Sequence, residues 1–178
     1  AARDAPLARV QEDALNIAEK FYDQRPELKR HLARTCVQGW KRAAFSTAII
    51  DGTDGTRLSR GKLLGVSAAL SRHLKKNFPE KRIAIVLPAG KGGVIANLAV
   101  LLAGKIPVGL NFTAGRAAIE CTKQRAGIQP AISAKAFRDR FPDCPWPYNV
   151  VLLATLIPPL THTHLLWWLS RLRLPRLL

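Results

Sequence analysis

The sequence has no methionine, three cysteines and far fewer acidic than basic residues. Without a methionine the chain of 178 residues lacks an initiator residue, so we expect it to be processed or cut from a longer protein. Cys36, Cys121 and Cys144 are odd in number, far apart and without zinc-ligand spacing, which favours unpaired thiols in a reducing compartment. We therefore expect a cytoplasmic protein.

Long hydrophobic runs are also absent. The N-terminus mixes charged with apolar residues, unlike a signal peptide. The most apolar stretch, 165–169, is far shorter than the roughly 20 residues that cross a bilayer, so we expect no transmembrane helix. The hydrophobic content of 48% is nevertheless ordinary for a globular protein, and the length fits about one domain.

Basic residues outnumber acidic ones by 28 to 12, which gives a net charge of +16. Such a surplus of positive charge favours binding either to nucleic acid or to an anionic membrane surface. Because the surplus is spread along the chain without a recognisable nucleic-acid motif, we favour the membrane and expect no nucleic-acid partner. The alternative is that the basic residues have no partner and form a solvated face. The hydrophobic end would then be covered by a part of the protein that this sequence does not include.

The last 35 residues contain no acidic side chain and supply the candidate membrane-interface residues. Trp167 and Trp168 are followed closely by Arg171 and Arg173. Tryptophan inserts at the level of the lipid headgroups and arginine binds lipid phosphate, so we expect these four residues to meet anionic lipid.

The middle of the chain alternates strand-like runs with helical stretches. Ser59 is placed to cap a helix that ends near Pro79. Strands are expected at 47–51, 82–87, 105–110 and 131–133, and helices at about 92–103, 113–125 and 135–140. This alternation predicts an α/β fold with a mainly parallel sheet and helices on both faces.

We divide the chain into three parts. Residues 1–34 are a helical lead-in, in which Pro26 interrupts the pattern before a second helical stretch at 27–34. Residues 35–145 are the α/β part, and residues 146–178 are a basic, Trp- and Leu-rich linker or membrane-interface segment.

The strongest local candidate for a binding motif is the glycine-rich turn 87–93, in which Lys91 lies between a buried strand and a helix. Phosphate-binding loops occupy such a position because the backbone N–H groups at a helix start attract anions. The spacing fails, however, because a Walker A loop needs glycine where Ile85 stands and serine or threonine where Gly92 stands. We therefore favour a tight connection between strand and helix.

The four histidines give no catalytic site. His162 and His164 could share a metal on an extended segment, but no Cys, Asp or Glu follows Cys144 to complete a local ligand set. His31 and His73 lie in basic helical surroundings without a nucleophile motif. We expect no metal site.

Four short motifs between residues 82 and 133 occur in the order of a known family. They are Leu87-Pro88, Ala103-Gly104, Pro107-Val108-Gly109-Leu110-Asn111 and Ile132-Ser133. The stretch resembles the early part of the AMP-forming adenylation domain of acyl-CoA synthetases and their relatives. Upstream, Leu58-Ser59 resembles the opening-helix motif of the family, although Arg60 and Lys62 replace its usual tyrosine and glutamate.

Residues 110–116 are most similar to the synthetase half of bacterial acyl-[acyl-carrier-protein] synthetases of the 2-acylglycerophosphoethanolamine acyltransferase type. This resemblance implies a lipid-handling protein, peripheral at the inner membrane. It also implies that residues 1–34 are the tail of a preceding acyltransferase domain.

The resemblance implies a partial adenylation-domain N-terminal subdomain. The family uses ATP and Mg²⁺ to convert a carboxylic acid to an acyl-adenylate, then transfers the acyl group to the thiol of acyl carrier protein or CoA. Its phosphate loop ending in Pro-Lys, its ribose-binding carboxylate and its catalytic lysine have no counterpart before Leu178. We therefore expect an inactive fragment with no catalytic, cofactor-binding or metal-binding residue, no bound cofactor, and the remainder of the ligase as its partner.

The alternative is a non-enzymatic basic module that binds anionic membrane or nucleic acid. In either case, a sheet without its later strands would leave apolar surface exposed, so we expect the isolated chain to aggregate or to depend on a partner.

Overall fold

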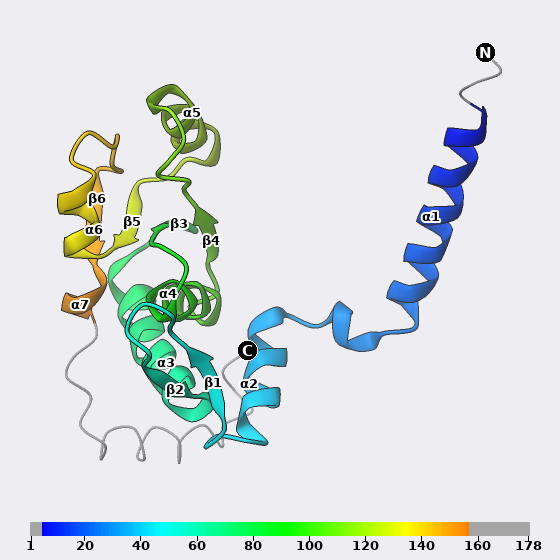
Figure 1. The fold of residues 1–178 in the computed structure, drawn as a ribbon, viewed down its shortest axis with the longest axis horizontal. Coiled ribbons are helices and arrows are strands. Elements are labelled where there is room, and N and C mark those ends of the chain that lie inside the picture. Colours follow the sequence, from blue (N-terminus) through cyan, green and yellow to red (C-terminus); the bar gives the residue numbers. More distant parts are fainter. Residues whose placement is uncertain (1–4, 157–178) are drawn as a thin grey trace. The chain divides into compact units, whose positions relative to one another are not determined.

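The computed structural model describes residues 5–156, and these form two compact units that divide between Cys36 and Val37. The first unit contains helix α1 (Ala5–Asp23), the short 3₁₀ helix η1 (Pro26–Lys29) and the start of α2 (Leu32–Lys41) (Figure 1). Pro26 starts η1, as expected for a residue with a fixed φ and no N–H to donate. The second helical stretch predicted at 27–34 is therefore wrong in its bounds, because η1 ends at Lys29 and α2 starts at Leu32.

The second unit begins with a hairpin and a long helix. Strands β1 (Thr47–Ile50) and β2 (Arg57–Ser59) pair antiparallel, and α3 (Arg60–Asn77) follows at once. The hydroxyl of Ser59 accepts a hydrogen bond of 3.2 Å from the backbone N–H of Lys62. The predicted cap is thus confirmed. Strand β2, in contrast, was not predicted.

Four parallel strands form the main sheet. They are β3 (Arg82–Val86), β4 (Ile106–Gly109), β5 (Pro130–Ser133) and β6 (Asn149–Leu152), in the order β4-β3-β5-β6. The connecting helices are α4 (Lys91–Leu102), α5 (Arg116–Ala126) and α6 (Lys135–Arg140), and α7 (Leu153–Leu156) follows the last strand. The predicted α/β fold with a parallel sheet is confirmed.

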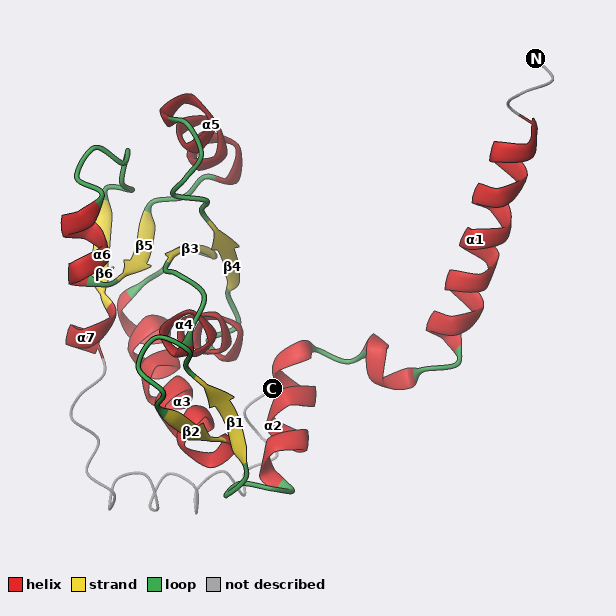
Figure 2. Ribbon diagram, viewed as in Figure 1, coloured by secondary structure: helices red, strands yellow, loops and turns green. Residues whose placement is uncertain are grey.

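Strand β3 separates two hydrophobic cores. In Figure 2, α4 and α5 lie on opposite sides of this strand. Its Ile83 and Ile85 pack with apolar side chains of α3 and α4, because alternate residues of a strand face opposite sides. Its Ala84 and Val86 pack on the other face, where α5 and α6 contribute Ile119 and Phe137. The prediction of helices on both faces is thus confirmed as well.

Strand β6 lies inside the segment 146–178 that the sequence suggested was a linker. Asn149–Leu152 pairs in parallel with β5, and its Val150 and Val151 pack on opposite faces of the sheet. The indole of Trp146, just before β6, donates a 3.0 Å hydrogen bond to the carbonyl oxygen of Phe141. The sheet therefore extends at least to Leu152. Between residues 5 and 156, no helix has the length and the hydrophobicity to cross a membrane.

Candidate functional site

The strand order places a candidate site at the carboxyl ends of β3 and β5. Ligands of open parallel sheets bind outside the carboxyl ends of the strands, at the point where the strand order reverses. Here the chain goes from β3 outward to β4 and then returns past β3 to β5. At this point the buried hydroxyl of Ser133 donates a 2.9 Å hydrogen bond to the carbonyl oxygen of Val86, so the two strand ends are tied together.

The turn between β3 and α4 requires a glycine. Gly90 has φ of +155°, a conformation that residues with a side chain rarely adopt. A Cβ atom at this position would lie 3.2 Å from Oδ2 of Asp51. The glycine therefore permits both the turn and the close approach of the β1–β2 hairpin.

The carboxylate of Asp51 occupies the start of α4. Its Oδ2 accepts a 3.1 Å hydrogen bond from the backbone N–H of Lys91, the first residue of the helix. Its Oδ1 accepts hydrogen bonds from the hydroxyl and the backbone N–H of Thr53. The hydrogen bond from the Thr53 hydroxyl, with those from the two backbone N–H groups, lowers the pKa of Asp51. The anion at this helix start is thus a carboxylate of the protein itself.

The side chain of Lys91 is engaged as well. Its ammonium forms an ion pair with Oδ2 of Asp54 and donates a 2.8 Å hydrogen bond to the hydroxyl of Thr56. Oδ1 of Asp54 accepts hydrogen bonds from the backbone N–H of Thr56 at 3.0 Å and from its hydroxyl at 2.6 Å. The ammonium of Lys91 is the main reason why the pKa of Asp54 lies well below its ordinary value of 3.8. We call Asp51, Thr53, Asp54, Thr56 and Lys91 the hairpin clamp.

The hairpin clamp supports the interpretation of the glycine-rich turn as a tight connection. The N–H and the ammonium of Lys91 that could have faced a phosphate instead bind two aspartates of the preceding hairpin. Sequence reasoning did not single out these aspartates. A signal was present, because each is followed two residues later by a threonine, a pattern typical of Asx turns.

The other residues considered from the sequence do not gather at this site. Nδ1 of His31 accepts a 3.2 Å hydrogen bond from the backbone N–H of Ala33, and the ring of His73 lies 6.2 Å from that of Phe78. Across residues 5–156, no three His, Cys, Asp or Glu residues lie close enough to hold a metal ion. His162, His164, Trp167, Trp168, Arg171 and Arg173 lie outside the described residues.

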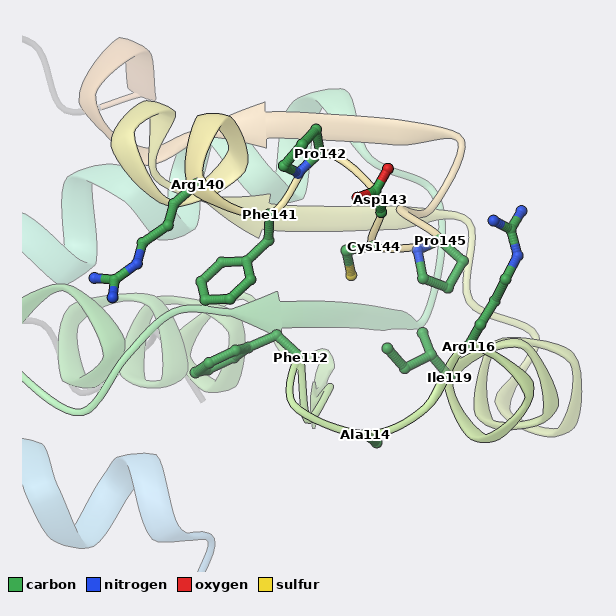
Figure 3. Close-up of a pocket in the computed structure, with 10 residues that line it drawn as sticks. All are labelled: Phe112, Ala114, Arg116, Ile119, Arg140, Phe141, Pro142, Asp143, Cys144 and Pro145. Atoms are coloured by element: carbon green, nitrogen blue, oxygen red, sulfur yellow. The ribbon is translucent and has the colours of Figure 1, made fainter.

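A cavity of about 270 Å³ lies on the α5 face of the sheet (Figure 3). Phe112 and Ile119 line it from one side and Phe141 from the other, with Arg116 and Arg140 at its edges. The rings of Phe112 and Phe141 are 5.3 Å apart, centroid to centroid. The cavity is slightly smaller than typical ligand pockets, which hold about 300–1,000 Å³.

The lining of this cavity is mixed, because aromatic and aliphatic side chains lie beside Arg116, Arg140 and Asp143. The thiol of Cys144 points into it, and burial raises the pKa of this thiol. The group is therefore protonated at neutral pH and a poor nucleophile. Cys36, Cys121 and Cys144 are unpaired in the structure, as the sequence predicts. The ten lining residues include Arg116, Arg140 and Asp143 and no histidine.

Solved structures with a similar fold come from nonribosomal peptide synthetases. A variant of the synthetase FmoA3 in its alpha-methyl-L-serine-AMP bound form has a TM-score of 0.63 at 18% identity, covering 74% of this chain and 15% of that one. The N-terminal subdomain of Klebsiella oxytoca NpsA in complex with 3-hydroxybenzoyl-AMSN has a TM-score of 0.63 at 22% identity, covering 76% and 33%.

A third similar structure is an artificial fusion of Klebsiella oxytoca NpsA with ThdA, an adenylation–PCP di-domain. Its TM-score is 0.59 at 22% identity, over 72% of this chain and 24% of that one. No protein-family model matches the sequence, and no curated protein matches it. The chain therefore has the α/β fold of an adenylation N-terminal subdomain, and it spans a third or less of these relatives.

The hairpin clamp predicts how stability depends on pH. Because folding lowers the pKa of Asp51 and Asp54, both contribute stability above about pH 4 and lose it as the pH falls further. At pH 7 we expect Asp51→Asn or Asp54→Asn to lower Tm by about 5 °C. The gap to the wild type should shrink between about pH 5 and pH 2. Thermal unfolding followed by circular dichroism at each pH measures both effects.

A matched control is Asp143→Asn, since Asp143 has no ion pair among residues 5–156. We expect this variant to keep the wild-type Tm at pH 7 within about 2 °C. If Asp143→Asn lowered Tm as much as the clamp variants, the hairpin clamp would contribute no more to stability than an aspartate outside it.

Proposed function

We propose that this chain is part of an AMP-forming acyl-acid ligase. The enzyme would convert a fatty acid and ATP to an acyl-adenylate and pass the acyl group to the thiol of acyl carrier protein or CoA. The observation that supports the proposal most is the parallel sheet β4-β3-β5-β6, whose fold matches the adenylation N-terminal subdomain.

Three of the four motifs behind the sequence resemblance lie where elements end, which adds independent support. Leu87-Pro88 directly follows β3, and Ala103-Gly104 ends α4, with Gly104 at φ of +74°. Ile132-Ser133 ends β5, where Ser133 ties it to β3. Each motif thus occupies a position at which this fold needs a turn, a helix end or a strand contact.

In this proposal the chain supplies scaffold, and the remainder of the ligase supplies the chemistry. The hairpin clamp uses the start of α4 for a carboxylate of the chain itself. ATP and Mg²⁺ would therefore be bound by groups of the remainder, among them the phosphate loop and the catalytic lysine that the resemblance implies. Oriented donors and a metal ion of this kind stabilise the charge that develops on the reacting phosphate.

Two features favour a lipid substrate over an amino or aryl acid. Residues 110–116 resemble the acyl-[acyl-carrier-protein] synthetase subgroup. The net charge of +16 suits an enzyme that works beside anionic lipid. In the structure, Oδ1 of Asn111 holds the loop of this motif by accepting hydrogen bonds from the backbone N–H and the hydroxyl of Thr113.

The proposal is tested by ATP–pyrophosphate exchange. We expect no exchange from the 178 residues alone with any acid. We expect exchange with fatty acids, and not with serine or 3-hydroxybenzoate, when the chain is extended downstream along its own coding sequence. Robust exchange by the 178 residues alone would overturn the assignment of a scaffold role. An extended protein that activates only amino or aryl acids would overturn the fatty-acid substrate.

Peripheral membrane binding is tested by flotation with liposomes that contain anionic phosphatidylglycerol. We expect replacement of Trp167 and Trp168 by alanine together with Arg171→Gln and Arg173→Gln to reduce binding at least about tenfold. The matching deletion should remove only residues 157–178, because Asn149–Leu152 forms β6 of the sheet. Undiminished flotation of both variants would place membrane binding elsewhere in the chain.

A further inference from the structure

Helix α1 carries an apolar stripe with a heptad spacing. Leu7, Val10, Ala14, Ile17 and Phe21 follow one another at intervals of three, four, three and four residues. This spacing places all five on one side of the helix. Leu7 is 67% exposed, Val10 66%, Ile17 70% and Phe21 50%, so the other residues of the first unit leave the stripe largely uncovered.

The charge of α1 indicates what kind of surface suits this stripe. The helix contains the acidic residues Glu12, Asp13, Glu19 and Asp23 and the basic residues Arg9 and Lys20, so its net charge is 2 − 4 = −2. The whole chain, in contrast, carries +16. A helix with a negative net charge is repelled by anionic lipid, whereas membrane-surface helices have a basic polar face. The stripe is therefore better suited to protein than to membrane.

Two oppositely charged residues flank the stripe along the same side. Asp13 and Lys20 each directly precede a stripe residue, Ala14 and Phe21, and thus take equivalent places in the heptad. Both are exposed, and neither takes part in an ion pair among residues 5–156. Residues at this heptad position select the partner and the orientation of paired helices.

An antiparallel pair of two α1 helices would bury the apolar stripe and also pair Asp13 with Lys20. When Ala14 of one copy packs against Ile17 of the other, Val10 packs against Phe21. In this register Asp13 lies opposite Lys20 of the second copy, and the symmetry of the pair repeats that contact. A parallel pair would instead place Asp13 near Ala18 and form neither ion pair.

We infer that α1 is a self-association helix, which pairs antiparallel with α1 of a second copy of this chain and forms two reciprocal Asp13–Lys20 ion pairs. The stripe from Leu7 to Phe21 is about 22 Å long. Such a short contact buries less than a standard interface, so the dimer is weak, with a dissociation constant of about 10–500 µM.

The test is sedimentation equilibrium of the full chain over a concentration range that brackets this value. Asp13→Lys and Lys20→Asp each turn two attractions into two repulsions, so each should weaken the dimer about tenfold. The double variant Asp13→Lys/Lys20→Asp restores both pairs with reversed polarity and should return to within about threefold of the wild type. Ile17→Glu, which places a charge in the stripe, should abolish the dimer.

The matched control is Glu12→Lys, which makes the same charge change on the side of α1 opposite the stripe. It should leave dimerisation unchanged within about twofold. Far-UV circular dichroism establishes that α1 remains helical in each variant. A wild-type chain that stays monomeric at 500 µM, or a double variant as weak as the single ones, would overturn the inference. A concentration-dependent mass that Ile17→Glu does not change would also overturn it.

Discussion

The hydrogen bond from the backbone N–H of Lys91 to the carboxylate of Asp51 ties the β1–β2 hairpin to the start of α4. Gly90 is required by its φ of +155°, and its lack of a side chain also lets the Asp51 carboxylate approach closely. The ion pair of Lys91 with Asp54 is a second link between the hairpin and α4. A helix start that would otherwise attract an external anion is thereby satisfied within the chain.

Strand β3 fixes the position of the turn that contains Gly90 and Lys91, because the strand is buried on both faces. Ile83 and Ile85 fix α3 and α4 on one side, while Ala84 and Val86 belong to the core on the other side. The hairpin clamp follows the carboxyl end of β3, whereas the cavity near Phe112 and Phe141 lies on the α5 face. The helix start that Asp51 caps and the cavity near Phe141 are therefore separate features of the fold.

Most of the fold could be predicted from the sequence, because β3, α4, β4, α5 and β5 alternate apolar runs with glycine-marked ends. Strand β6 could not, since Asn149–Leu152 is short and follows a proline-rich stretch that reads as a linker. Its strand character comes from pairing with β5, a long-range contact. The hairpin clamp was missed for the same reason, because Asp51 and Lys91 are 40 residues apart in the chain.

Nuclear magnetic resonance tests whether the carboxylate of Asp51 closes the start of α4 to external anions. A ¹⁵N-labelled chain is titrated with Mg²⁺-ATP up to about 5 mM while the backbone amides of residues 91–93 are followed. These amide signals should not move at pH 7, and they should respond to Mg²⁺-ATP once Asp51 is protonated at low pH. Saturable shifts of these signals with ATP at pH 7 would contradict this closure of the helix start.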